Sequence, residues 1–557
     1  MSLPSITRVS VLLAENDPYS AWYLEAVRQI GILHEVVSES IFDQLGQIRT
    51  LALCGNGSLT PAQKRNVESF LMGGGTVVCS GSTWGIDDLL GLNSTGASRP
   101  SGRQWLVPKT SDRLWNERTT KTLAFGCQKV QSTLAHVIAS YQSGDLALTR
   151  FGRTIYLGPH LGQTMALMMM GRAVECDSVG PGDSSAYTED GILRAEDGTA
   201  LSFKEDRKQD APVQFFHQPY ADTLRDIWAR CLVEAVETAG GTPAILWHWP
   251  NAAEAAATCS VDCDDLQLEA AARIVGALNK FGIRAAWMVP QQGYSQDVYK
   301  NIKKWDHDIG LLFSGTGEGF NADQFKINHL TISRAASSPN LMCSRPSDGR
   351  WEGYSKYYDM CDHAGVKLSM SKGGRQAGTS GFLFGTSRPF MPIGHKGKTY
   401  RVLELPYTLY SPGFATHHSA DPTVVEEALH HNGCVHFVYT TSSAKNDEFD
   451  KSAQNLHMLL RQSHMKFFSP ETIANYEFGR RQLKVEVNAD MIKLATDTQL
   501  PGLTILVGGQ DVTLSHMGGR SPGRNVARYG SHFSVHVFDL EARAGHTLKC
   551  EHERRAA

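Results

Sequence analysis

Apolar and polar positions in the first part of the chain alternate between short buried runs and longer amphipathic segments. Three apolar runs predict strands: Val9–Leu13, Leu51–Cys54 and Thr76–Cys79. Between the last two, Thr60-Pro61 supplies an N-cap and a first-turn proline for a helix. Because strands that alternate with helices at this spacing form a parallel sheet covered on both faces, we expect residues 1–241 to form an α/β domain.

A long amphipathic helix marks the end of this first region. Tyr220–Thr238 carries its apolar residues on one face, and Gly240-Gly241 follows it. From Pro243 the strand–helix rhythm starts again and continues over about 230 residues, which is typical of a (β/α) barrel. We therefore assign residues 242–480 to a barrel.

Two shorter regions have the pattern of antiparallel β-structure. The turn signals Asp190-Gly191 and Asp197-Gly198 predict a β-hairpin over residues 187–203. After residue 480, segments of alternating apolar and polar residues are separated by turns. This alternation predicts a small antiparallel β-sandwich over residues 481–557.

Composition and charge restrict the functions open to the protein. The 557 residues carry a net charge of −3, so no basic surface for nucleic acid or an anionic membrane is expected. No stretch approaches the roughly 20 apolar residues that span a bilayer, and the start lacks a signal-peptide pattern. The eleven cysteines are scattered without a Cys-x-x-Cys pair, which indicates reduced thiols and a cytoplasmic protein.

The most informative segment is an acidic cluster that follows a buried strand, Asp262-Cys263-Asp264-Asp265. The carboxyl ends of barrel strands form the active face, and carboxylates crowded there repel one another and raise a pKa. Such a cluster suits a general base with an orienting carboxylate. The structural alternative is that Asp264 or Asp265 caps the helix that starts near Leu266. Asp262 precedes the cap position, which favours a functional role.

The same region resembles polysaccharide deacetylases of the carbohydrate esterase family 4 type in four motifs that occur in order. The acidic cluster corresponds to the first, His307–Gly310 to the second, Arg345 to the third and Val435–Thr440 to the last. The resemblance implies a deacetylase-type (β/α) barrel. It also implies that Asp262 is the general base, that Asp264 is its partner and that Arg345 braces the base.

The sequence departs from that family at the residues that would bind zinc, the cofactor that the resemblance implies. The two histidine ligand positions fall on Leu312 and Thr316, neither of which holds zinc. Asp264 is the one inherited ligand. The place of the family's late catalytic histidine falls on Thr440, while His436 lies inside the same strand. We therefore assign no metal-binding residues.

Other side chains near the expected active face are candidates for acid–base chemistry or substrate contact. His436 and the loop residue His418 are the histidines that could take part. Trp351 or Tyr354 would form part of a wall on which a sugar stacks. The expected partner is a carbohydrate or a glycosylated small molecule.

The N-terminal region resembles the flavodoxin-like class I glutamine amidotransferases. The nearest match to their nucleophile elbow is Val77–Gly81, which lacks the first glycine of the motif. The downstream His-x-Glu pair would lie near His160, and its glutamate is absent. These departures favour a scaffold, or a domain through which a homo-oligomer forms, over a catalytic role for Cys79.

Three functional hypotheses follow. The leading one is a hydrolase that acts on an amide or ester of a carbohydrate, since deacetylation is the reaction that the resemblance implies. The loss of ligands at Leu312, Thr316 and Thr440 favours a catalytically inactive carbohydrate-binding or assembly protein. The retention of Asp262 and Arg345 favours a metal-independent hydrolase or lyase on the same barrel.

Overall fold

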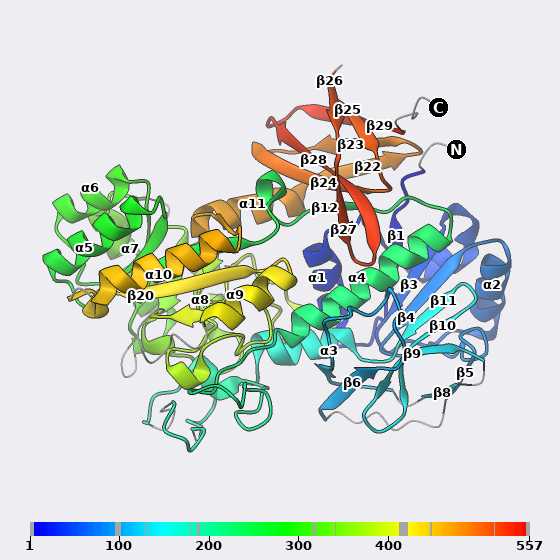
Figure 1. Ribbon diagram of the computed structural model, residues 1–557, viewed down its shortest axis with the longest axis horizontal. Helices are drawn as coiled ribbons and strands as arrows, with labels where there is room; N and C mark the ends of the chain where they lie inside the picture. Colours follow the sequence, from blue (N-terminus) through cyan, green and yellow to red (C-terminus); the bar gives the residue numbers. More distant parts are fainter. Residues whose placement is uncertain are drawn as a thin grey trace. The chain divides into compact units, whose positions relative to one another are not determined.

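A computed structural model shows a mixed α/β protein that divides into two compact units (Figure 1). The first unit comprises residues 1–166, 223–252 and 476–557, and the second comprises 167–222 and 253–475. The structure describes residues 5–94, 102–128, 130–132, 134–178, 180–186, 190–315, 319–339, 341–411, 421–445, 448–516 and 519–552. The predicted α/β fold class is confirmed, whereas the boundaries of the three expected domains stay a prediction.

The first unit contains a flavodoxin-like sheet. Its parallel part has the order β2-β1-β3-β4-β11, and antiparallel strands β10, β9, β6 and β7 continue it. The strands of the parallel part are β1 (Val9–Leu13), β2 (His34–Val37), β3 (Thr50–Cys54), β4 (Thr76–Ser80) and β11 (Thr154–Leu157). The antiparallel strands are β6 (Gln104–Pro108), β7 (Thr122–Ala124), β9 (His136–Tyr141) and β10 (Leu146–Phe151). An order of 2-1-3-4 is that of doubly wound nucleotide-binding folds.

Local sequence signals position the helices of this sheet. The helices are α1 (Ser20–Ile30), α2 (Pro61–Met72), α3 (Leu161–Met165) and α4 (Tyr220–Thr238). Thr60 caps α2 as predicted, because its hydroxyl accepts from the backbone N–H of Gln63 and the Gln63 side chain accepts from the Thr60 N–H. Helix α4 spans the predicted residues, and its Ala235 carbonyl accepts a hydrogen bond from Thr76 at the start of β4.

The C-terminal region of the first unit forms a sandwich around an apolar core. One sheet has the order β12-β24-β28-β27 and the other β22-β23-β29-β25-β26, all antiparallel. Their strands are β12 (Ala244–Leu246), β22 (Lys484–Asn488), β23 (Met491–Ala495), β24 (Leu500–Gly508), β25 (Val512–His516), β26 (Gly519–Pro522), β27 (Arg524–Arg528), β28 (Ser531–Leu540) and β29 (Gly545–His552). Buried side chains of both sheets share one core, among them Ile492, Leu503, Ile505 and Leu514.

The second unit is built on a parallel sheet with the order β18-β17-β16-β15-β14-β13-β20-β19. The strands are β13 (Ala256–Asp262), β14 (Ala285–Val289), β15 (Asp308–Phe313), β16 (Cys343–Pro346), β17 (Leu368–Ser369), β18 (Leu403–Glu404), β19 (Leu409–Tyr410) and β20 (Cys434–Thr440). Within the described residues no ladder joins β18 to β19, so the barrel is open there. Its strands are almost entirely buried, which explains why they are continuous apolar runs in the sequence.

Helices follow the strands of this sheet in the order expected for β/α units (Figure 1). They are α5 (Leu268–Lys280), α6 (Gln296–Lys304), α7 (Ala322–Ala335), α8 (Lys356–Ala364), α9 (Asp421–His430), α10 (Glu448–Gln462) and α11 (Pro470–Gln482). None of the helices in the described part of the chain combines the length and apolar character needed to cross a bilayer.

The segment before α4 belongs to the second unit and lies against the loops that follow β16 and β17. Val174 pairs with Gly353, Arg194 with Arg350 and Phe216 with Gly381 in isolated β-bridges. The predicted hairpin over 187–203 is wrong in its described part, because residues 190–203 contain a single 3₁₀ turn, Ala195–Gly198, and no strand. Residues 187–189 lie outside the described part. Backbone groups of this segment form β-bridges with loops far away in the sequence instead of forming a local hairpin.

Asp308, at the amino end of β15, should make the stability of the second unit depend on pH. Its Oδ2 accepts from the backbone N–H of Glu471 at 3.2 Å. Burial, with the Glu471 charge as a second cause, raises the pKa of Asp308 from 3.8 to about 7, and the Ser469 hydroxyl opposes this rise. The folded state therefore binds more protons than the unfolded chain between these values, so stability should fall as pH rises through this window.

We expect Asp308→Asn to weaken this pH dependence, because an amide at this position carries no charge at any pH. The midpoint of thermal unfolding, measured from pH 4 to 8, should fall less with rising pH in the variant than in the wild type. Each kcal/mol of pH-dependent free energy of unfolding that the substitution removes corresponds to a difference of about 2–4 °C in the midpoint. Asp297→Asn, in the exposed first turn of α6, is the matched control and should follow the wild type. Parallel curves for Asp308→Asn and wild type would contradict the assignment.

Candidate active site

The carboxyl ends of the barrel strands bring the sequence-predicted residues together. Asp262 ends β13 and is in register with Thr440 at the end of β20. Arg345 lies on β16 and is in register with Leu312 on β15. This is the end of a parallel barrel at which active sites form.

Arg345 is the centre of the arrangement and is 2% exposed. Its Nη1 donates to Asp262 Oδ1 at 2.6 Å, and its Nη2 donates to Ser260 Oγ at 2.8 Å. Its Nε donates to the Met370 carbonyl at 2.8 Å, while the guanidinium lies 4.8 Å from the centre of the Tyr407 ring. The predicted brace is thus in place geometrically, and the sequence did not single out Ser260 or Tyr407.

Asp262 is held through one oxygen and leaves the other oxygen weakly bound. Among the described residues, Oδ2 receives one long hydrogen bond, from the Tyr410 hydroxyl at 3.4 Å. Burial raises the pKa of Asp262, the Arg345 charge and hydrogen bond lower it, and the Asp264 charge raises it. Burial also raises the pKa of Tyr410, so its hydroxyl keeps the proton that it can donate. A base held at Oδ1 can take a proton at Oδ2.

His436 does not lie at the mouth of the barrel as expected. It is completely buried, its Nδ1 lies 3.3 Å from the Leu405 carbonyl, and its Nε2 lies 2.8 Å from Ser260 Oγ. Because a carbonyl only accepts, Nδ1 carries the hydrogen and Nε2 accepts from the serine. Burial and the Arg345 charge lower the pKa of His436 well below its usual range. A neutral ring with both nitrogens engaged orients Ser260 and Arg345.

Asp264 binds the neighbouring loop rather than the helix that follows it. Its Oδ1 accepts from the Thr441 hydroxyl at 3.0 Å and from the Ser442 N–H at 2.9 Å, and its Oδ2 accepts from the Ser442 hydroxyl. The following helix instead begins after Gln267. Asp264 therefore joins the loops that follow β13 and β20.

The described residues do not fit the zinc site that the resemblance implies. Leu312 is buried and offers no donor atom, and the oxygens of Asp264 are engaged by loop hydroxyls and an N–H. Within the described ranges, no three His, Cys, Asp or Glu side chains are grouped to hold a metal ion. Thr316 and His418 lie outside the described residues.

The predicted sugar-stacking wall needs correction at Trp351. The Trp351 ring is completely buried, so it offers no face to a sugar. Its Nε1 donates to the Gly353 carbonyl at 3.0 Å. Tyr354 is half-buried and packs against the His395 ring with centroids 4.6 Å apart. Of the two predicted aromatic residues, Tyr354 is the one that retains exposed surface.

A buried carboxylate at the end of β18, Glu404, was not assigned a role from the sequence. Its Oε1 accepts from the backbone N–H groups of Ser371 and Lys372 at 2.8 and 2.9 Å. Its Oε2 accepts from the hydroxyls of Ser369, Ser371 and Tyr358 at 2.5, 2.8 and 3.1 Å. Burial raises the pKa of Glu404, and these hydrogen bonds oppose that rise. The carboxylate fixes the loop that follows β17.

The side chain of Lys372 in that loop is also buried. Its Nζ donates to the Met170 carbonyl at 2.9 Å. It lies 3.7 Å from the centre of the Trp351 ring and 4.9 Å from that of Phe384. Burial lowers the pKa of Lys372, and the Glu404 charge opposes this. The ammonium group of Lys372 thus lies against the Trp351 ring at the place that a sugar would need.

A second carboxylate that the sequence did not reveal comes from the segment before α4. Glu196 is 2% exposed, and neither oxygen has a hydrogen bond in good geometry from a described residue. Burial raises the pKa of Glu196, and the nearby Arg375, Thr379 and Arg194 oppose this. Its charge also raises the pKa of Tyr407, the residue stacked on Arg345, although burial is the main cause of that rise.

The N-terminal domain places a buried polar pair beyond the carboxyl ends of β1 and β11. His160 Nε2 lies 2.6 Å from Asp17 Oδ2, and His160 Nδ1 accepts from the Gln163 N–H at 3.0 Å. Cys79 is completely buried, and burial raises the pKa of its thiol far above its usual range. A protonated, inaccessible thiol is no nucleophile, so Cys79 does not act as one in this structure.

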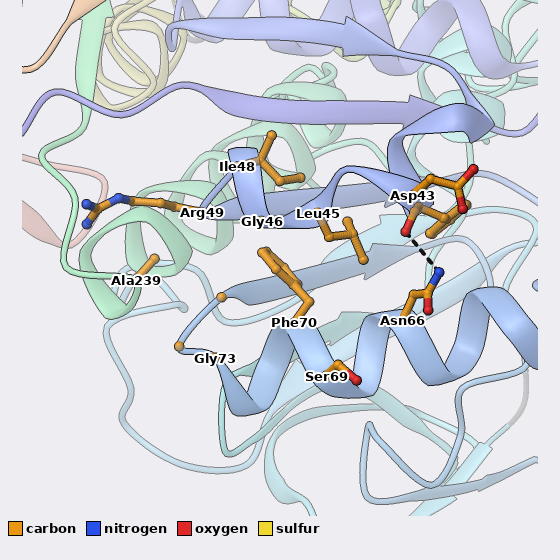
Figure 2. A pocket seen from close by; sticks show the side chains of 13 residues that line it. Asp43, Leu45, Gly46, Ile48, Arg49, Asn66, Ser69, Phe70, Gly73 and Ala239 are labelled. Atoms are coloured by element: carbon orange, nitrogen blue, oxygen red, sulfur yellow. Dashed lines mark hydrogen bonds between the residues drawn. The ribbon is translucent and has the colours of Figure 1, made fainter.

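A pocket of about 750 Å³ lies at the opposite end of the same sheet (Figure 2). Phe42, Leu45, Ile48 and Phe70 are among its apolar lining residues, and Gly73–Gly75 line it as well. This pocket precedes the amino ends of β3 and β4, whereas ligands of open α/β sheets bind beyond the carboxyl ends. Its charged lining residues are Asp43 and Arg49, a pair without evident chemistry.

Comparison with known protein families and with curated proteins finds no match. Among solved structures, the carbohydrate deacetylase Agd3 is similar over 98% of this chain and 99% of its own, with 8% identity and a TM-score of 0.41. A Mycobacterium smegmatis protein provisionally assigned as a polysaccharide deacetylase is similar over 41% of this chain and 92% of its own (12% identity, TM-score 0.32).

A glutamine amidotransferase from Thermotoga maritima is similar over 28% of this chain and 79% of its own, with 11% identity and a TM-score of 0.24. All three TM-scores lie below 0.5.

We expect Glu404→Met to lower the free energy of unfolding by about 3–5 kcal/mol, because it leaves two backbone N–H groups buried without an acceptor. Glu404→Gln should cost only about 1 kcal/mol, since its amide oxygen can keep the Oε1 position while the hydroxyls rotate. Urea unfolding measures both variants. Glu352→Gln, which removes a half-exposed carboxylate, is the control. Equal losses for the Met and Gln variants would contradict this account.

Proposed function

We propose that the protein is a hydrolase that removes an acyl group from an amide or ester of a carbohydrate. The observation that carries this proposal is the buried Asp262–Arg345 pair at the carboxyl end of a parallel barrel. Among the described residues, Asp262 Oδ2 receives a single long hydrogen bond. The carbohydrate as substrate class rests on the resemblance of four ordered motifs to polysaccharide deacetylases.

In this proposal Asp262 acts on a water molecule. Oδ2 takes a proton from the water as its oxygen attacks the carbonyl carbon, and the carbonyl becomes a tetrahedral oxyanion. The Tyr410 hydroxyl, which lies 3.4 Å from Oδ2 and keeps its proton, is the nearby donor for that oxyanion. Collapse breaks the C–N or C–O bond and releases the acid and the deacylated sugar.

Proton delivery to the leaving group is assigned to Glu196. Its carboxyl is buried without a good hydrogen bond from a described residue, and its raised pKa favours the protonated form that an acid needs. Arg345, Ser260 and His436 position Asp262 without touching the substrate. No step is assigned to a metal, because the described donors do not fit one.

The rival proposal is a carbohydrate-binding protein without catalysis. The observation that favours it is the apolar Leu312 at a position where the resembled family binds metal. Both proposals use the same face of the barrel, so they differ in turnover and not in location.

Asp262→Asn should lower kcat for release of acetate from N- and O-acetylated oligosaccharides by at least about 10³-fold, with the fold retained. The amide keeps the size of Asp262 and cannot take the proton. Acetate release is measured together with binding of the same oligosaccharides. The control is Asp297→Asn, which changes an exposed carboxylate on α6 and should retain wild-type turnover.

Binding without acetate release in the wild type would favour the rival proposal. Acetate release that survives in Asp262→Asn would reject Asp262 as the base.

The pH profile of kcat/KM should be bell-shaped, rising as Asp262 ionises and falling as Glu196 loses its proton. The midpoint of the acid limb should lie at a higher pH than the usual pKa of an aspartate, because burial raises the pKa of Asp262. Glu196→Gln should lower kcat by about 10²-fold and remove the basic limb while leaving the acid limb in place. A basic limb that persists in Glu196→Gln would exclude Glu196 as the acid.

A further inference from the structure

A small basic cavity lies in the first unit, whereas the residues that the proposed reaction uses belong to the second unit. Its volume is about 260 Å³, and it is lined by the end of α1, the start of β2 and the start of β22. Leu33, Leu246 and Val485 contribute apolar walls. Four arginines line it as well: Arg8, Arg28, Arg480 and Arg481.

Two of these arginines are neutralised by carboxylates of their own unit. Arg480 Nη2 binds the two oxygens of Glu477 at 2.7 and 2.9 Å. Arg481 binds Glu25 through Nη1 and Nη2 at 2.6 and 2.9 Å, and its Nε binds Glu477 at 2.6 Å. These ion pairs fix the two guanidinium groups at the cavity wall.

The other two arginines, Arg8 and Arg28, differ from this pair. Among the described residues, neither Arg8 nor Arg28 forms an ion pair, and the Arg8 guanidinium donates to the Val485 carbonyl. Four guanidinium groups and two carboxylates therefore leave an excess of two positive charges at this cavity.

The effect of this excess charge is visible on neighbouring groups. Burial lowers the pKa of Arg28, the Glu25 charge opposes this, and the Arg481 charge adds to it. Burial also lowers the pKa of His34, which lines the same cavity, and Arg28, Arg480 and Arg8 lower it further. Cations held together at a partly apolar wall repel one another, and a bound anion relieves that repulsion.

We propose that this cavity binds an oxyanion, the phosphate or carboxylate group of a ligand, through Arg8 and Arg28. Guanidinium groups bind both anions bidentately, and the apolar walls keep water from competing. The cavity volume suits one such group with a small attached body. None of its lining residues has a role in the acyl hydrolysis proposed above.

The test measures binding by the full chain with sodium phosphate and sodium glucuronate, each compared with sodium chloride at equal ionic strength and with glucose. Calorimetric titration and the shift of the unfolding midpoint report on binding without any turnover. Phosphate, glucuronate or both should bind and raise the midpoint, and glucose and chloride should not. Stronger binding of phosphate identifies a phosphorylated ligand, whereas stronger binding of glucuronate identifies an acidic sugar.

Arg28→Gln and Arg8→Gln should each weaken the binding at least tenfold, while Arg49→Gln, which changes an exposed arginine of the pocket in Figure 2, should not. Arg28 lines the cavity, but the residue retains exposed surface and forms no ion pair with a described residue, so its replacement should leave the fold intact. Absence of binding for both anions would overturn the proposal. Binding that persists unchanged in a variant that carries both Arg8→Gln and Arg28→Gln would overturn it as well.

Discussion

The buried guanidinium of Arg345 is the interaction on which the rest of the barrel face depends. From β16, it donates hydrogen bonds to Asp262 and Ser260 on β13 and to the Met370 carbonyl after β17. The Tyr407 ring, from the loop after β18, stacks on it. Removing one partner from a buried ion pair leaves an uncompensated charge and costs about 3–5 kcal/mol. Asp262 and Arg345 are thus required together, whether the site binds or reacts.

Much of the fold could be predicted from local pattern. Parallel strands that are buried on both faces are apolar runs in the sequence, and the helices at Pro61–Met72 and Tyr220–Thr238 begin and end at recognisable signals. Asp262 was singled out because it ends a predicted barrel strand, whereas Arg345 was singled out by the resemblance of its motif to polysaccharide deacetylases. The hairpin failed at Asp197-Gly198 because a turn signal gives no information on what its flanks will pair with.

The residues that sequence analysis missed are those defined by distant neighbours. Glu196 acquires its environment from Arg375 and Tyr407, and Lys372 from Met170 and Trp351, all far away along the chain. No periodicity or spacing records such contacts. Trp351 shows the converse, since a tryptophan near an active face suggests a sugar platform until its burial is known.

Strand β12 gives the β-sandwich a dependence on a segment that lies far before it in the sequence. Ala244–Leu246 pairs antiparallel with Ile505–Val507 of β24, so the sandwich is not complete within residues 481–557. A fragment limited to those residues would turn β24 into an open edge with unpaired N–H and C=O groups on a strand rich in leucine, isoleucine and valine. Such edges recruit other chains. A soluble fragment of this region must therefore carry the 244–246 segment, joined to it by a linker or supplied as a peptide.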